Sequence, residues 1–126
     1  MKIKGGFGLK SSRGEIKIAE VLENSGLNFE EEYTFADLVS SSGRALRFDF
    51  AVLDDEGGVD FLIEFQGIQH YQAKSKFGGA KALTRQKYND MKKRAYCLQR
   101  NLTLIAIPYW DEPLINYDYI MKAAGY

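Results

Sequence analysis

The chain of 126 residues contains one cysteine, one histidine and no net formal charge, and it has no apolar run of membrane-spanning length. Because Cys97 has no second cysteine to pair with, an internal disulfide and a cysteine-rich zinc site are both excluded. The first residues lack the apolar core of a secretory signal peptide. We therefore expect an intracellular, cytoplasmic protein without a membrane partner.

The zero net charge hides an uneven distribution of lysine and arginine. Residues 1–11 carry three lysines and no acid, and between Tyr71 and Asn101 nine basic residues stand against one acid, Asp90. The length suits one domain with a single core. We therefore expect a basic N-terminal arm at 1–11 and one domain at 12–126.

The strongest chemical signal is a predicted β-hairpin in which residues 47–53 and 60–66 flank an acidic turn at 54–58. Each strand carries one carboxylate, Asp49 or Glu64, inside an otherwise apolar run. Buried charge is costly unless it is paired or bound to a metal. The two carboxylates are therefore the first indication of a chemical site.

Strand periodicity predicts where these carboxylates point. Side chains alternate faces along a strand, so Phe48 and Phe50 are expected on one face of the first strand and Asp49 on the other. On the second strand Glu64 and Gln66 share a face. Asp49 and Glu64 would then lie close together and repel unless a divalent cation separates them. Carboxylate oxygens suit Mg²⁺ or Mn²⁺, with water and substrate phosphate in the remaining positions.

His70 and Glu15 are two further candidates, each with a plainer interpretation. His70 follows Gln66 by four residues, just past the predicted strand end. Its imidazole can therefore reach the same pocket and transfer a proton. Alternatively, His70 is a partly buried side chain that only forms hydrogen bonds. Ser12 and Glu15 fit a capping box at the start of a helix that ends near Asn24. The same glutamate also lies on the apolar stripe of that helix, where it would face the pocket.

The remaining patterns predict an α-β-β-β-α-β order with a terminal helix, which is an α+β (α/β) fold with a mixed sheet flanked by helices. The expected elements are a strand at 29–35, a connector at 36–44, a helix at 81–99, an apolar strand at 102–107 covered on both faces and a last helical piece at 114–123. The apolar stripe of the helix at 81–99 is Tyr88, Met91, Ala95 and Leu98. Trp110 is expected in the core or stacked on the end of the sheet.

Together these segments resemble the PD-(D/E)XK nuclease superfamily, whose motif is an Asp on one strand and Asp/Glu-x-Lys on the next. More narrowly they resemble its phage-type endonuclease branch, with homing and recombination-like members, and they are distantly similar to very-short-patch repair endonucleases. The matching segments cover residues 11–111 in order, which is more specific than any one of them. They are Ser12–Glu15, Arg47–Phe50, Ile63–Tyr71, Asn89–Lys93 and Ile107–Trp110.

The resemblance implies a restriction-endonuclease-like core and a metal-dependent DNA endonuclease that hydrolyses phosphodiester bonds, in the host cell if a phage encodes it. The implied catalytic residues are Asp49, Glu64, Gln66, His70 and Glu15, with Asp49 and Glu64 as ligands of Mg²⁺ (or Mn²⁺). DNA is the expected partner, and a homodimer or a second protein would supply specificity.

The basic stretch has two interpretations. Such a run is usually a solvated surface, but here it adjoins the predicted pocket, as a phosphate-contacting surface would. The predicted DNA-binding residues are Lys74, Lys76, Lys81, Arg85, Lys87, Lys92, Lys93 and Arg94.

Gln66 departs from the superfamily pattern because it stands where the motif has lysine. A neutral amide supplies no positive charge, so the missing role would pass to His70, which we favour, or to a lysine of the second helix such as Lys87 or Lys93. The departure also leaves an alternative function, a catalytically weak or inactive nuclease-fold module that binds DNA or a protein.

Two plainer interpretations concern the charged residues themselves. Asp49 and Glu64 would each form a structural ion pair, with Arg47 or Lys93 as the partner. Asp90 and Lys93, three residues apart, would form a simple pair on the helix surface.

Overall fold

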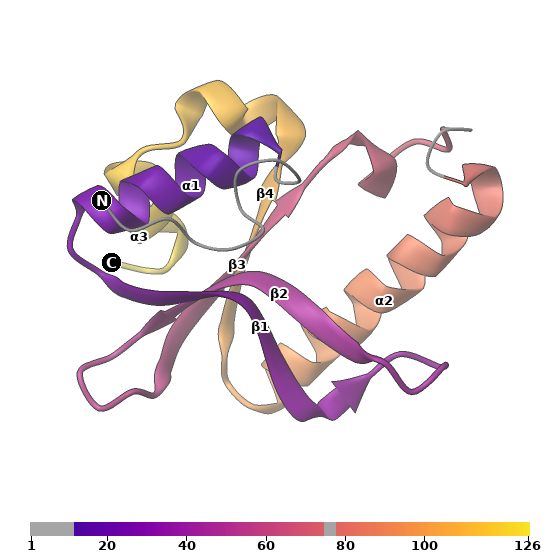
Figure 1. The fold of residues 1–126 in the computed structure, drawn as a ribbon, viewed down its shortest axis with the longest axis horizontal. Helices are drawn as coiled ribbons and strands as arrows, with labels where there is room; N and C mark the ends of the chain where they lie inside the picture. Colours follow the sequence, from indigo (N-terminus) through magenta and orange to yellow (C-terminus); the bar gives the residue numbers. More distant parts are fainter. Residues whose placement is uncertain (1–11, 75–77) are drawn as a thin grey trace.

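A four-stranded mixed sheet with helices on both faces forms the body of the protein (Figure 1). The computed structural model describes residues 12–74 and 78–126; the predicted basic arm at 1–11 and the predicted DNA-binding residue Lys76 lie outside them. The elements are α1 (Arg13–Asn24), β1 (Asn28–Val39), β2 (Ala45–Leu53), β3 (Val59–Gln66), η1 (Ile68–His70), α2 (Gly79–Gln99), β4 (Thr103–Pro108), η3 (Tyr109–Leu114) and α3 (Tyr117–Ala123). The predicted α+β class and its element order are confirmed.

The strands lie in the order β1-β2-β3-β4, with β4 parallel to β3 and the other pairs antiparallel. As predicted, β1 lies at an edge, although it continues to Val39 through residues expected in the connector. The other edge is β4, where Thr103 and Ala106 are exposed, so the prediction that this strand is covered on both faces is wrong. Because Gln66 pairs with Pro108, the segments that follow β3 and β4 emerge at the same end of the sheet.

Two apolar layers separate the sheet from its helices. The layer under α1 and α3 includes Phe50, Phe61 and Ile63, whereas the layer under α2 includes Phe48 and Leu62 (Figure 1). In the described part of the chain no helix is long and apolar enough to cross a membrane.

The predicted start of α1 is confirmed, and it docks closely on β3. Ser12 accepts a hydrogen bond from the backbone N–H of Glu15 at 3.2 Å, and the Glu15 carboxylate accepts one from the backbone N–H of Ser12 at 3.1 Å, which completes the capping box. A Cβ atom on Gly14 would lie 2.2 Å from the ring of Phe65, so only glycine permits this approach. The contact holds the first turn of α1, and with it Glu15, beside the strand that carries Glu64.

The side of α2 that faces the sheet is not the predicted one. Its predicted apolar stripe is exposed, with exposed fractions of 46% for Tyr88, 50% for Met91 and 81% for Leu98. The buried residues are instead Asp90, Lys93, Tyr96 and Cys97. The prediction is wrong because it counted apolar side chains alone, whereas polar side chains can be buried where partners are available.

Candidate active site

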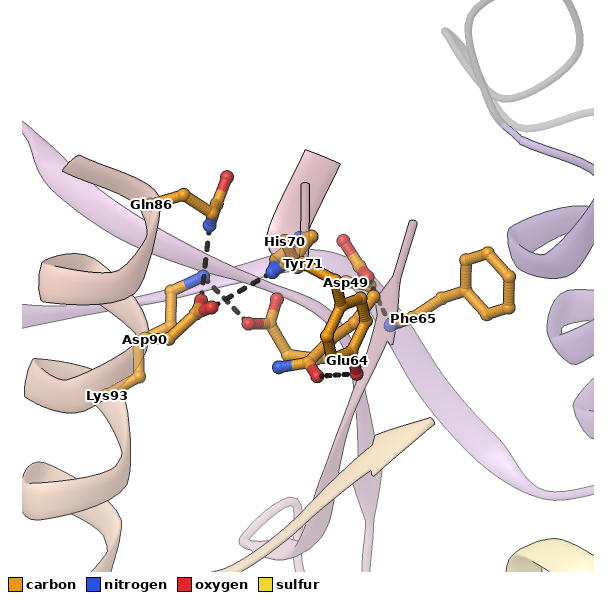
Figure 2. Close-up of polar contacts among 9 residues, drawn as sticks. Asp49, Glu64, Phe65, His70, Tyr71, Gln86, Asp90 and Lys93 are labelled. Atoms are coloured by element: carbon orange, nitrogen blue, oxygen red, sulfur yellow. Dashed lines mark hydrogen bonds and ion pairs between the residues drawn. The ribbon is translucent and has the colours of Figure 1, made fainter. Parts of the chain in front are cut away.

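Asp49 lies where β2 and β3 separate. Backbone pairing between the two strands reaches Phe50 and Ile63 and does not continue to Asp49. There the Asp49 side chain accepts a hydrogen bond from the backbone N–H of Phe65 through Oδ2 at 2.7 Å (Figure 2). The carboxylate thus replaces a missing backbone partner in the ladder.

The simple alternation predicted for β2 is wrong at this residue. Phe48 packs in the layer under α2, whereas Phe50 packs in the layer under α1 and α3. On β1, Glu32 lies between the partners of Phe48 and Phe50, and its φ of +54° is unusual for a residue other than glycine. The Asp49 side chain therefore points toward β3, beyond the last pair of β2 with β3, instead of onto one face of the sheet.

Asp49 lies in a region of negative charge. Burial, followed by the charges of Glu64 and Glu15, raises the pKa of Asp49 from 3.8 to about 8, although the hydrogen bond from Phe65 and the charge of Lys93 act in the opposite direction. Glu15 closes the capping box, as predicted, and its charge also acts on Asp49, whereas its place in the pocket stays a prediction.

Lys93 reaches from α2 to Glu64 in the interior of the protein. Its Nζ donates a hydrogen bond to Glu64 Oε1 at 2.9 Å, and the residues are only 8% and 6% exposed. The same Nζ lies 5.5 Å from the centre of the Phe48 ring. Burial raises the pKa of Glu64, and the charge of Lys93 opposes that shift. Lys93 is therefore not part of the exposed basic surface, and its predicted surface pair with Asp90 is wrong.

His70 forms a second polar contact with α2. Its Nδ1 lies 2.9 Å from Oδ2 of Asp90, and Oδ1 of Asp90 accepts a hydrogen bond from Gln86 at 3.1 Å (Figure 2). Burial acts to raise the pKa of Asp90, but the hydrogen bonds from His70 and Gln86 outweigh it, and the pKa lies below its ordinary value. The ionised carboxylate only accepts hydrogen bonds. His70 Nδ1 therefore donates to Asp90, and Nε2 is not part of this contact.

Gln66 accepts a hydrogen bond from a neighbouring tyrosine. The Tyr71 hydroxyl donates a hydrogen bond to Gln66 Oε1 at 2.6 Å. Of the three candidates for the role of the missing lysine, Lys87 is exposed on α2. Lys93 is buried in contact with Glu64, and His70 is in contact with Asp90. Lys93 and His70 are thus both held by carboxylates, Lys93 by Glu64 and His70 by Asp90.

The remaining predicted DNA-binding residues lie on or just before α2 and do not form one patch. Lys81, Arg85, Lys87 and Arg94 are exposed, whereas Lys74 and Lys92 are half-buried. Helical spacing puts Lys81 and Arg85 on one side of α2 and Lys87 and Arg94 on another. Lys92 also donates a hydrogen bond to the backbone carbonyl of Val39.

The two strand carboxylates fit a hard cation that keeps much of its water. Within residues 12–74 and 78–126 no group of three or more His, Cys, Asp or Glu side chains is arranged to hold a metal ion. Mg²⁺, however, is commonly bound through one or two carboxylates together with substrate phosphates. Among the described residues, Asp49 Oδ1 and Glu64 Oε2 accept no hydrogen bond. Burial raises the pKa of Asp49 most, and the charges of Glu64 and Glu15 add to that shift.

Sequence reasoning missed Asp90 as a partner of His70 and Tyr71 as a partner of Gln66. For Asp90 a signal was present, because Asp90, Lys93 and Cys97 follow the i, i+3, i+7 spacing of one helix face. Because the apolar stripe of α2 is exposed to solvent, this second face of the helix is the one that is buried against the sheet. For Tyr71 the sequence held no comparable signal.

Comparison with known proteins gives two viral relatives. No family model matches the chain, and no solved structure matches it. The chain is 33% identical over 95 residues to uncharacterized protein 094L of Frog virus 3 (isolate Goorha), covering 74% of this chain and 59% of that protein. It is 38% identical over 66 residues to uncharacterized protein 307L of Invertebrate iridescent virus 6, covering 51% of this chain and 34% of that protein. The chain thus aligns with 59% and 34% of the lengths of these two relatives.

Proposed function

We propose that this chain is a metal-dependent DNA endonuclease domain of the PD-(D/E)XK type, with a restriction-endonuclease-like core. The observation that carries the proposal is the buried contact between Lys93 and Glu64 beside Asp49. A pair of strand carboxylates and a lysine are the three groups of the superfamily motif. Here the lysine comes from α2 instead of the position of Gln66.

Each of these residues has a distinct role in the proposed reaction. Asp49 and Glu64 would hold Mg²⁺ (or Mn²⁺), an ion that polarises phosphate oxygens and lowers the pKa of bound water. Lys93 keeps Glu64 oriented and places a positive charge where negative charge develops on the phosphate. Glu15, whose charge acts on Asp49, adds to the negative potential that attracts the cation.

His70 is the proposed general acid or base. Asp90 fixes its proton on Nδ1, so Nε2 can take a proton from water or return one to the leaving oxygen. Gln66 keeps a secondary part, because its amide is neutral and its oxygen already accepts a hydrogen bond from Tyr71. The proposal therefore moves the role of the superfamily lysine from His70, which the sequence favoured, to Lys93.

DNA is the proposed substrate because exposed basic side chains follow α2, the helix that carries Lys93 and Asp90. Lys87 and Arg94 lie on one side of that helix and Lys81 and Arg85 on another, so phosphates of two strand segments would be contacted separately. Such contacts are independent of sequence and weaken with salt. A second copy of the chain or a partner protein would supply any sequence specificity.

Plasmid nicking tests the proposal directly. Supercoiled plasmid is incubated with Mg²⁺ or Mn²⁺ and the parent chain, Asp49→Asn or Glu64→Gln, with Asp55→Asn in the exposed turn as the matched control. We expect nicking by the parent and the control and none by the two site variants. Calorimetry should likewise show Mn²⁺ binding that both site variants lose. DNA binding without nicking at any metal concentration would instead identify an inactive nuclease-fold binding module.

A further inference from the structure

Three aromatic rings gather at the end of the sheet where β3 and β4 finish. Gln66 and Pro108, the last residues of these parallel strands, are paired. The chain then turns into η1 after β3 and into η3 after β4, so two segments far apart in sequence meet at this end. Tyr71 closes the first turn, and Tyr109 and Trp110 open the second.

The rings of Tyr71, Tyr109 and Trp110 contact one another; Tyr71 and Trp110 are exposed, and Tyr109 is half-buried. The ring centres lie 4.9 Å apart for Tyr71 and Trp110, 5.2 Å for Tyr109 and Trp110, and 5.8 Å for Tyr71 and Tyr109. Trp110 is 58% exposed and Tyr71 is 37% exposed. Trp110 therefore stacks at the sheet end, as one of its two predicted positions had it, and the core position is wrong. We call these three residues the ring cluster.

The ring cluster is not needed to fill the core. Neither apolar layer includes any of its members. Aromatic side chains stabilise a protein mainly through the large apolar area that they bury. Because Trp110 is largely exposed, it contributes little to the stability of the fold. Exposed aromatic rings are, however, the usual means of holding unstacked nucleotide bases, because every base offers a π-face.

The ring cluster is joined to the candidate active site through one hydrogen bond. The Tyr71 hydroxyl donates to Gln66 at 2.6 Å, and Gln66 lies two residues beyond Glu64 on β3. Tyr71 therefore makes two contacts: its hydroxyl contacts Gln66 on β3, and its ring contacts the ring of Trp110. A DNA strand whose phosphate lies beside the Lys93 ammonium group at Glu64 would bring its neighbouring bases to these rings.

The acidic residues next to Trp110 do not oppose this assignment. Asp111 accepts a hydrogen bond from the Tyr119 hydroxyl at 2.6 Å, and the Glu112 carboxylate lies 3.6 Å from Arg13. Both carboxylates therefore have a neighbouring donor that reduces their repulsion of a phosphate strand.

We propose that the ring cluster is a stacking platform for an unpaired base next to the cleaved phosphate, so that the substrate is single-stranded DNA or DNA with unpaired nucleotides. This assignment rests on the proposed function. Bases inside a duplex are stacked on each other and cannot offer their faces to a protein ring without being extruded. The platform thus selects DNA whose bases are already unstacked.

Tryptophan fluorescence tests the proposal without any cleavage. Trp110 is the only tryptophan of the chain, so its emission reports on this position alone. The full chain is titrated, in EDTA and at one salt concentration, with a short single-stranded oligonucleotide and with the duplex of the same length. We expect strong quenching by the single strand and little by the duplex. Absence of quenching by the single strand, or equal quenching by both DNAs, would overturn the proposal.

Affinities of variants, measured by anisotropy of labelled DNA, provide the second arm. Trp110→Ala should weaken binding of the single strand by about 5- to 150-fold, since stacking of one base contributes about 1–3 kcal/mol, and leave duplex binding unchanged. Tyr71→Phe keeps the ring and should retain the affinity. Tyr117→Ala, which removes an aromatic residue of 45% exposure outside the ring cluster, is the matched control. An equal loss in the control would assign the effect to general surface contact.

The outcomes separate this proposal from the proposed function. Nicking activity without single-strand quenching would leave the endonuclease proposal intact and remove the platform. Quenching without nicking under any metal condition would do the reverse. A change of emission on dilution of the protein alone would assign the ring cluster to self-association and would overturn the platform.

Discussion

The two faces of the sheet are built from the same strands but bury different chemistry. Under α1 and α3 the buried residues are apolar, as in Phe50, Phe61 and Ile63. Under α2 the apolar layer is interrupted by three buried charged residues, Glu64, Asp90 and Lys93. A protein that needed α2 only for stability would gain more from apolar residues there, since replacing buried ion pairs with well-packed apolar side chains is often neutral or stabilising. The buried charges under α2 are therefore the basis of the proposed function, whereas the apolar layer on the opposite face stabilises the fold.

This difference predicts that activity and stability can be changed independently of each other. Changes under α2 should alter cleavage far more than they alter the yield of folded protein. Changes under α1 and α3 should lower the free energy of unfolding and leave the rate per folded molecule unchanged.

His70→Ala should slow cleavage by about 10²–10⁴-fold, the range lost with a positioned acid or base. Mn²⁺ binding should persist, because Asp49 and Glu64 remain. The measurement is single-turnover cleavage at saturating protein, with exposed Gln72→Ala as the control. If His70→Ala cuts as fast as the parent, the histidine has only a structural part.

Phe61→Ala should lower the free energy of unfolding by about 3–5 kcal/mol, because Phe61 is 1% exposed and its removal leaves a cavity in the layer under α1 and α3. Urea denaturation measures the change. The cleavage rate, corrected for the folded fraction, should equal that of the parent. A large loss of rate in the folded fraction would break the separation between the two faces.

In the absence of metal, the charge around Asp49 should make stability fall as pH rises. The pKa of Asp49 is about 8 in the folded protein, against an ordinary value of 3.8. Between these values the folded state therefore holds a proton that the unfolded state has lost. The free energy of unfolding therefore decreases with rising pH across this window and levels off above it. Asp49→Asn should remove most of the slope in metal-free denaturation series. An equal slope in that variant would contradict the assignment.

Gly14→Ala should lower the free energy of unfolding by about 1–3 kcal/mol, as expected for overpacking, because the added Cβ would lie 2.2 Å from the Phe65 ring. Thermal unfolding measures the effect. Gly26→Ala, at a glycine with no atom near its Cβ position but with φ of +72°, separates steric overlap from backbone strain. A Gly14→Ala protein as stable as the parent would show that α1 can shift away from β3.

The sequence was sufficient for features decided by neighbouring residues. The capping box at Ser12, the end of α1 before Gly26 and the hairpin of β2 and β3 follow from local chemistry, and all were predicted correctly. Asp49, Glu64 and His70 were recognised as candidates because charged or titratable side chains stood in or beside apolar strands.

Features that depend on distant partners were not predictable in the same way. The predicted orientation of α2 was wrong because Lys93 and Asp90 are buried through contacts with partners outside the helix. Lys93 contacts Glu64 on β3, and Asp90 contacts His70 in η1. The position of Asp49 between the strands depends on the point where pairing with β3 stops. Sequence periodicity gives only the average direction of the side chains along a strand or helix. A break in strand pairing, or a partner from another element, leaves no trace in that periodicity and could not be predicted from it.

The central claim is that Lys93 on α2 supplies the charge that Gln66 cannot. The most direct test is metal-dependent plasmid nicking by Lys93→Met beside Lys92→Met. Lys92→Met removes the neighbouring lysine, whose Nζ donates to the Val39 carbonyl and lies 5.8 Å from the centre of the Tyr88 ring. Unfolding curves of both variants identify the fraction of folded protein. We predict a loss of about 10²–10³-fold in the folded fraction of Lys93→Met, the range for removal of one group that stabilises transition-state charge, and parental activity for Lys92→Met. Parental activity in Lys93→Met would contradict the claim.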